Sequence, residues 1–146
     1  MIFDQTGGVV AFEQVEHKQI CTQPGWCEHD PEEIWRNTKG CIDGAMSKAG
    51  LKAEDIAAIG ITNQRETTVV WDKETGRPFC NAVVWMDMRS QKLCEDLIAA
   101  DGADQFRDTT GLPVSPYFSG TKLKWMLDNI DGLREGAEAG KLVFGK

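Results

Sequence analysis

Residues 60–72 have the sequence Gly-Ile-Thr-Asn-Gln-Arg-Glu-Thr-Thr-Val-Val-Trp-Asp, in which a polar cluster interrupts an apolar, β-branched pattern. The apolar stretches at 56–62 and 67–72 predict two buried strands. The cluster Asn63–Glu66 lies between them, where a plain turn would use glycine, Asn-Gly or serine. Arg65 and Glu66 together offer several donors and a charged acceptor, which can bind vicinal hydroxyl groups. The alternative is an ion pair that only closes a strand end.

Outward from this stretch, strands alternate with helices along the chain. On the N-terminal side, the pattern predicts a hairpin over residues 1–16 with a glycine turn. It also predicts a helix from Asp30 to Gly50 whose apolar face packs on a sheet. On the C-terminal side, we expect a strand at 81–85, a helix from about Arg89 and a helix over 119–130. These elements predict an α/β fold class.

Length and charge favour one globular domain and exclude some partners. The chain has 146 residues, a mass of 16.2 kDa and a formal charge of −7 without a basic stripe, so nucleic acid is not an expected partner. No apolar run approaches the ~20 residues that a membrane-spanning helix needs, and no secretory signal is visible. We therefore expect a cytoplasmic protein without a membrane partner.

Cysteine and histidine usage does not indicate a disulfide framework or a metal site. The five cysteines are odd in number and widely spaced, which predicts reduced structural thiols. His17 and His29 are not at ligand spacing from each other or from a cysteine. No GxxxxGK[ST] or GxGxxG motif occurs, so a self-sufficient nucleotide site is not evident.

Two aromatic residues are further candidates for a binding site. Trp85 ends the predicted strand at 81–85, where an indole can cover the carbon face of a polyol, although core packing is an equally simple role. Tyr117 is the only tyrosine and lies in the loop Pro113-Val-Ser-Pro-Tyr-Phe-Ser-Gly120, just before a predicted helix. Its hydroxyl could bind a ligand, or its ring could simply anchor the loop.

Four segments carry a resemblance to a known family. Residues 60–72, Pro24-Gly-Trp-Cys-Glu-His-Asp-Pro31, Asn81-Ala-Val-Val-Trp85 and the stretch from Thr110 to Trp125 resemble the glycerol-phosphorylating branch of the FGGY carbohydrate kinase family. The resemblance covers essentially the whole chain. It implies a ribonuclease H-like (actin-like) α/β fold in which two large domains form the active-site cleft. It also implies Mg²⁺-assisted transfer of the γ-phosphoryl group of ATP to glycerol, giving sn-glycerol 3-phosphate, by a homo-oligomer.

The resemblance also assigns roles to the candidate residues. Arg65 and Glu66 match the pair that binds the glycerol hydroxyls, Trp85 matches the tryptophan along the carbon backbone, and Tyr117 matches the glycerol-binding tyrosine. Met86 and Met88 depart from the family pattern, in which glutamine and arginine are common. The substrate-binding residues expected in this chain are thus Arg65, Glu66, Trp85 and Tyr117.

The family pattern extends beyond both ends of the chain. Its first strand and Asp-Gln-Gly-Thr-Thr-Ser phosphate loop would precede Met1, so Asp4-Gln5-Thr6 is not that loop. Its general-base aspartate and C-terminal nucleotide-binding domain would follow Lys146. We therefore expect residues 1–146 to be a partial N-terminal domain without catalytic, ATP-binding or metal-binding residues, inactive alone. A non-catalytic polyol- or subunit-binding protein and a kinase acting on another sugar or polyol are the alternatives.

Overall fold

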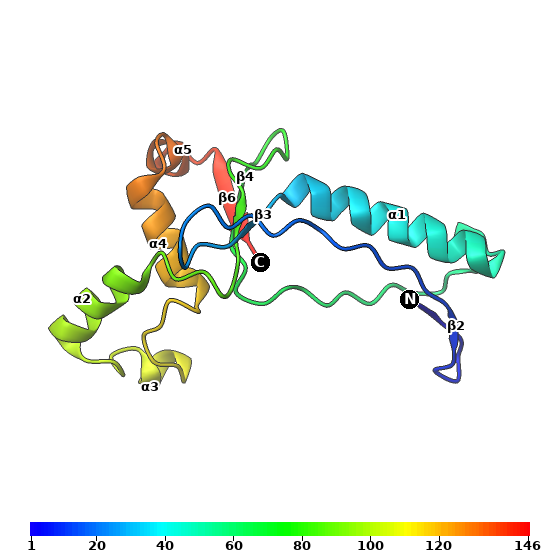
Figure 1. Ribbon diagram of the computed structural model, residues 1–146, viewed down its shortest axis with the longest axis horizontal. Coiled ribbons are helices and arrows are strands. Elements are labelled where there is room, and N and C mark those ends of the chain that lie inside the picture. Colours follow the sequence, from blue (N-terminus) through cyan, green and yellow to red (C-terminus); the bar gives the residue numbers. More distant parts are fainter. The chain divides into compact units, whose positions relative to one another are not determined.

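The computed structural model describes residues 1–146, which fall into two compact units (Figure 1). The first unit comprises Met1–Lys18 and Asp30–Thr62, and the second comprises Gln19–His29 and Asn63–Lys146. The secondary structure is mixed α/β, with three two-stranded antiparallel sheets. None of the helices combines the length and apolar character needed to cross a bilayer.

The N-terminal hairpin of the first unit is confirmed. Strand β1 (Ile2–Phe3) pairs antiparallel with β2 (Val9–Ala11). Between them, the Asp4 carboxylate accepts hydrogen bonds from the backbone N–H groups of Thr6 (2.8 Å) and Gly8 (2.9 Å) and from the Thr6 hydroxyl (2.6 Å). This segment is therefore a side-chain-stabilised turn.

The long helix α1 (Pro31–Ala49) begins and ends where predicted. The Asp30 carboxylate accepts a hydrogen bond from the N–H of Glu32, and Gly50 ends the helix with a left-handed φ of 66°. The helix lies against β2, but among its residues only Ala45 is fully buried. Trp35 and Ile42 are 57% and 54% exposed, so the predicted packing of its apolar face on a sheet is only partly realised.

The predicted strand at 56–62 is wrong. After a short 3₁₀ turn at Ala53–Asp55 (η1), these residues are irregular, and Ile59 and Ile61 are 81% and 89% exposed. A strand requires a neighbouring strand to satisfy its backbone N–H and C=O groups, and no segment of this chain pairs with 56–62. An apolar pattern alone is therefore not enough to make a strand.

The strands of the second unit confirm the two other predicted strands in shortened form. Strand β3 (Glu28–His29) pairs with β5 (Ala82–Val83), and β4 (Val69–Asp72) pairs with β6 (Leu142–Gly145). An isolated bridge between Thr68 and Val83 links the two pairs. It brings the segment that follows Glu66 next to the segment that ends in Trp85.

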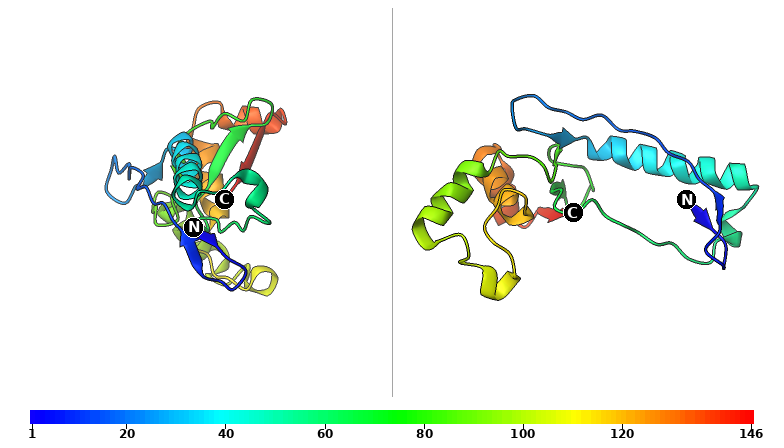
Figure 2. Two further views of the ribbon diagram at one scale, coloured as in Figure 1. Left: turned by 90° about the vertical axis from the view of Figure 1, so that its right-hand side faces the viewer. Right: turned by 60° about the horizontal axis from the view of Figure 1, so that its bottom comes forward.

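Four helices lie on one side of the β4–β6 pair (Figures 1 and 2). They are α2 (Gln91–Asp101), α3 (Arg107–Thr110), α4 (Ser119–Asn129) and α5 (Leu133–Glu138), of which α2 and α4 were predicted. Met126 and Leu133 pack on Val70 and Val83 to form the core. Every fully buried residue except Ala45 belongs to this unit, so it provides the rigid support for any site. All five cysteines are free thiols, as predicted.

Candidate functional site

Strand pairing places the polar cluster beside Trp85. The N–H of Thr68 donates to the Val83 carbonyl (2.8 Å), and the N–H of Val83 donates back to Thr68 (2.9 Å). Next to this pair, the N–H of Trp85 donates to the hydroxyl of Thr67 at 3.2 Å. Because this ladder runs directly into Glu66, the turn that carries the Arg65–Glu66 pair is held next to the end of β5.

Glu66 is bound to the first residue of α4. One carboxylate oxygen accepts hydrogen bonds from both the N–H (2.8 Å) and the hydroxyl (2.7 Å) of Ser119, and the other forms an ion pair with Lys146 at 2.6 Å. The N–H groups of a first helical turn have no partner within the helix, so a carboxylate there is stabilised. Glu66 adopts a left-handed φ of 62°, the only non-glycine residue of the chain to do so.

The Glu66 carboxyl is ionised at neutral pH. Burial by itself raises its pKa, but the hydrogen bonds from Lys146 and Ser119 outweigh burial and lower the pKa to about 2. The group is therefore a permanent acceptor, able to bind a hydroxyl donor at any physiological pH.

This shift predicts that the contribution of Glu66 to stability depends on pH. Because the pKa falls from 4.5 to about 2 on folding, the contribution is complete above pH 4.5 and is lost as the pH falls from 4.5 towards 2. Urea unfolding of the native chain and of Glu66→Gln should show that the native chain loses its advantage in free energy of unfolding across this interval. A difference that stays constant with pH would contradict the assignment.

Trp85 and Tyr117 form an aromatic pair at the same place. Their ring centroids lie 6.1 Å apart with an interplanar angle of 62°, and Tyr117 also meets Phe118 edge to face at 5.2 Å. Trp85 is 40% exposed, so it is not a core residue. Tyr117 lies in the loop before α4, where its N–H donates to the Ser115 hydroxyl at 3.2 Å. The pair can present an apolar wall to a small ligand.

Arg65 is exposed and makes no hydrogen bond or ion pair with the rest of the chain. The alternative of an Arg65–Glu66 ion pair is therefore not found, since Glu66 pairs with Lys146 instead. Glu66, Trp85 and Tyr117 gather around the start of α4, and Arg65 follows the same turn with its guanidinium free. Ligand hydroxyls would meet an uncommitted donor group and an ionised acceptor.

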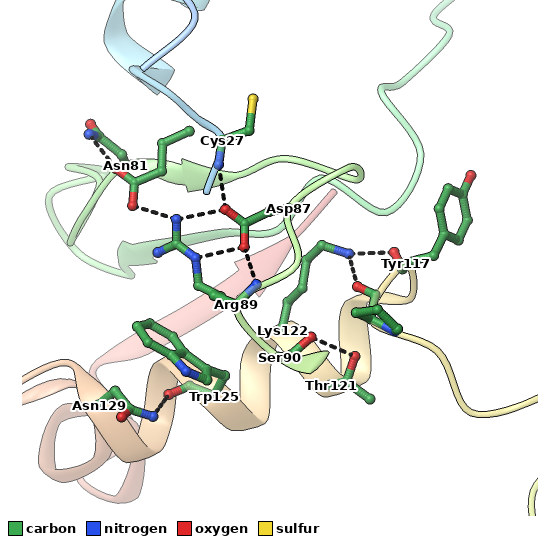
Figure 3. Close-up of polar contacts among 12 residues, drawn as sticks. Cys27, Asn81, Asp87, Arg89, Ser90, Tyr117, Thr121, Lys122, Trp125 and Asn129 are labelled. Carbon is green, nitrogen blue, oxygen red and sulfur yellow. Dashed lines mark hydrogen bonds and ion pairs between the residues drawn. The ribbon is translucent and has the colours of Figure 1, made fainter. Parts of the chain in front are cut away.

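Ser119 and Lys122 were not predicted from the sequence. Lys122 is fully buried on α4, and its ammonium donates to the carbonyl oxygens of Pro116 (2.6 Å) and Tyr117 (Figure 3). Burial lowers its pKa to about 8, although the negative charges of Asp87 and Glu66 partly oppose this. Lys122 precedes Met126 by four residues, so helical periodicity could have assigned it to the buried face.

A buried ion cluster lies in the same compact unit as the site. Both oxygens of the fully buried Asp87 accept from the Arg89 guanidinium at 2.8 Å, and Asp87 also accepts from the N–H of Cys27 at 2.6 Å (Figure 3). Arg89 pairs with Glu28 at 2.7 Å. The guanidinium carbon lies 3.9 Å and 5.1 Å from the ring centroids of two tryptophans, Trp26 and Trp125. Because each charged group in this cluster has a partner of opposite charge, we assign the cluster a structural role.

A cavity of about 590 Å³ opens beside Glu66 within the second unit. Most of its walls are apolar side chains, which include Leu93 and Leu97 of α2, Phe106 directly before α3, and Leu112 between α3 and α4. Its size lies within the range of small-molecule sites. Glu66 and Ser119 form a polar part of its lining.

The Asp4–Gly7 turn does not fit a nucleotide phosphate or a metal ion. One Asp4 oxygen is engaged by three donors of its own turn, so this carboxylate is committed locally. These bonds, with the one from Thr6 first, lower the pKa of Asp4. That this segment is not a phosphate loop stays a prediction.

Comparisons with known proteins give one family. Residues 1–145 match the model described as "FGGY family of carbohydrate kinases, N-terminal domain". The chain is 57% identical over 145 residues to "Glycerol kinase" of Chloroflexus aurantiacus, covering 99% of this chain and 29% of that protein. The crystal structure of Plasmodium falciparum glycerol kinase with ADP superposes with a TM-score of 0.91 at 33% identity, covering 99% and 29% of the two chains. A gluconate kinase from Lactobacillus acidophilus gives 0.78 at 26% identity, covering 90% and 26%.

These matches confirm the resemblance and the predicted ribonuclease H-like α/β fold class. The chain spans about 29% of the length of the curated relatives it matches.

Proposed function

Because the chain belongs to the FGGY family of carbohydrate kinases, we propose that it carries the acceptor-binding part of an enzyme that transfers the γ-phosphoryl group of ATP to glycerol. The observation that carries this proposal is the grouping of an ionised Glu66, a free Arg65 and the Trp85–Tyr117 aromatic pair around one helix start. A polyol needs this combination of donor, acceptor and apolar surface.

Each residue has a distinct part in binding. Arg65 donates to one glycerol hydroxyl oxygen, and the Glu66 carboxylate accepts from a hydroxyl proton. Trp85 covers the carbon backbone, while Tyr117 extends the same apolar wall and its hydroxyl can bond a ligand hydroxyl. Together they bind and orient the acceptor so that one terminal hydroxyl is left for reaction. Phosphoryl transfer depends on this positioning of the acceptor.

ATP and Mg²⁺ enter the proposal through the family, and the crystal structure of the Plasmodium glycerol kinase with ADP supports a nucleotide. When bound, they supply the transferred group and neutralise its developing charge. The Asp4–Gly7 turn does not fit them, because one oxygen of the Asp4 carboxylate is already bonded by three donors of its own turn. We assign no catalytic residue to this chain, and the nucleotide-binding domain is proposed to lie outside residues 1–146.

The cellular compartment, oligomeric state and partners of the enzyme are also part of the proposal. We propose a cytoplasmic homo-oligomer that binds neither nucleic acid nor membrane. The five free thiols support a reducing compartment, and the charge of −7 argues against a phosphate-backbone partner.

We prefer glycerol over a sugar or another polyol as the substrate because the chain is more similar to a glycerol kinase. Identity is 57% to the Chloroflexus glycerol kinase and 26% to the gluconate kinase. A non-catalytic polyol-binding role would use the same residues, but no observation favours it over catalysis.

A chimeric enzyme tests the proposal. Residues 1–145 of this chain replace the matching segment of the Chloroflexus aurantiacus glycerol kinase, and ADP release is followed with glycerol, xylulose and gluconate. We expect glycerol-dependent turnover within about tenfold of the parent enzyme and a preference for glycerol over both xylulose and gluconate. The unmodified parent is the control. A chimera with a native circular dichroism spectrum that turns over only xylulose or gluconate, or none of the three substrates, would contradict the proposal.

A further inference from the structure

Lys122 is a charged residue whose surroundings are unusual. Its side chain extends from α4 into the interior with no exposed surface, and no carboxylate forms an ion pair with it. Its partners are two backbone carbonyl oxygens, those of Pro116 and Tyr117. The groups whose charges act on it are Asp87, Glu66 and Cys94, and its ammonium lies 5.8 Å from the centroid of the Tyr117 ring.

Keeping an ammonium group at this position is costly. Burial without a paired carboxylate disfavours the charged form, and a methionine or leucine would fill a similar volume without that cost. The hydrogen bonds from Lys122 to the two carbonyl oxygens therefore indicate its role. They tie the loop before α4 to the body of the helix.

The two carbonyl groups belong to the peptide units on either side of the Tyr117 Cα atom. When both peptide units are held, the backbone angles of Tyr117 are constrained, and the direction of its Cα–Cβ bond follows from them. Figure 3 shows the Lys122 side chain projecting from α4 to this backbone. The ring of Tyr117 is then presented to Trp85 at 6.1 Å.

We propose that Lys122 is a positioning residue that holds Tyr117 against Trp85 and thereby shapes the acceptor site. This inference rests on the proposed function for its catalytic consequence. The same helix start also binds Glu66 through Ser119, so the segment from Pro116 to Lys122 aligns two of the acceptor contacts.

The single tyrosine of the chain allows a direct test of position. Incorporated 3-fluorotyrosine gives one ¹⁹F resonance, and Trp85→Phe should shift it, which establishes that the signal senses the indole. Lys122→Met should shift or broaden the same resonance, because methionine cannot donate the hydrogen bonds to the two carbonyl oxygens. Lys124→Met, two residues away on the exposed side of α4, is the matched control and should leave it unchanged.

An unchanged ¹⁹F resonance in Lys122→Met would overturn the inference. If Lys122→Met does not retain the native circular dichroism spectrum, Lys122→Gln gives the same comparison, since it keeps an N–H donor of shorter reach without charge. Its resonance should move in the same sense as in Lys122→Met, and an unchanged signal would again overturn the inference.

Kinetics of the chimera test the catalytic consequence. Lys122→Met should raise the glycerol KM by at least about fivefold while the ATP KM changes by less than about twofold, and Lys122→Arg should recover part of the loss. Equal changes in both KM values would indicate general destabilisation and contradict positioning. A chimera without glycerol turnover would count against the proposed function, whereas the ¹⁹F result judges Lys122 independently.

Discussion

Arg65→Ala in the chimeric enzyme should lower kcat/KM for glycerol about 10- to 150-fold and leave the KM for ATP unchanged. Loss of a charged hydrogen bond costs about 1.5–3 kcal/mol, which corresponds to this range. Arg65 is exposed and makes no hydrogen bond or ion pair within the chain, so its removal should not affect folding. The whole kinetic loss can then be assigned to the bound acceptor.

The matched control is Arg77→Ala. Arg77 is also an exposed arginine, in the turn after β4, and takes no part in the proposed site. It should retain the kinetics of the unsubstituted chimera. Steady-state assays at varied glycerol and saturating ATP make the comparison, and unaltered glycerol kinetics in Arg65→Ala would remove Arg65 from the site.

Arg89→Met should lower the free energy of unfolding of the second unit by about 3–5 kcal/mol. Arg89 is 3% exposed and neutralises two carboxylates, of which that of Asp87 has no exposed surface. Without the guanidinium, Asp87 retains the Cys27 N–H and the Arg89 backbone N–H as donors but loses its counter-charge. The contact with the Trp26 ring at 3.9 Å is lost as well.

Urea unfolding monitored by tryptophan fluorescence measures this effect. Arg107→Met is the control, because Arg107 and Asp104 form a surface pair with 50% and 66% exposed side chains, and its loss should cost less than about 1 kcal/mol. Adding Asp87→Asn to Arg89→Met should recover part of the loss, since it removes an uncompensated charge. A loss no larger than that of Arg107→Met would show that the cluster is not what supports the second unit.

Local signals in the sequence predicted much of the fold. Asp30, Pro31 and Gly50 delimit α1 because caps act within one turn of the helix they end. The Arg65–Glu66 pair was recognisable because it interrupts an apolar pattern where a turn needs no charge. In each case the information lies within a few residues, so no long-range contact is required.

Other features depended on partners distant in the sequence. The apolar residues 56–62 resemble a strand, but they are irregular because backbone groups form a ladder only with a neighbour. The partner of Glu66 could not be predicted either, since Ser119 is 53 positions away and the adjacent Arg65 was the nearer candidate.

The sequence by itself determined the family, the boundaries of α1 and the residues proposed to bind the acceptor, because these depend on local chemistry and on motif identity. Only the tertiary structure decided that Glu66 binds the start of α4, that Arg65 remains free, and that Lys122 is buried beneath Tyr117. The physical reason is that burial and hydrogen bonding are properties of the neighbours that a side chain acquires on folding. A lysine on a helix is typically solvated, and only the surrounding packing made this one a support for the loop.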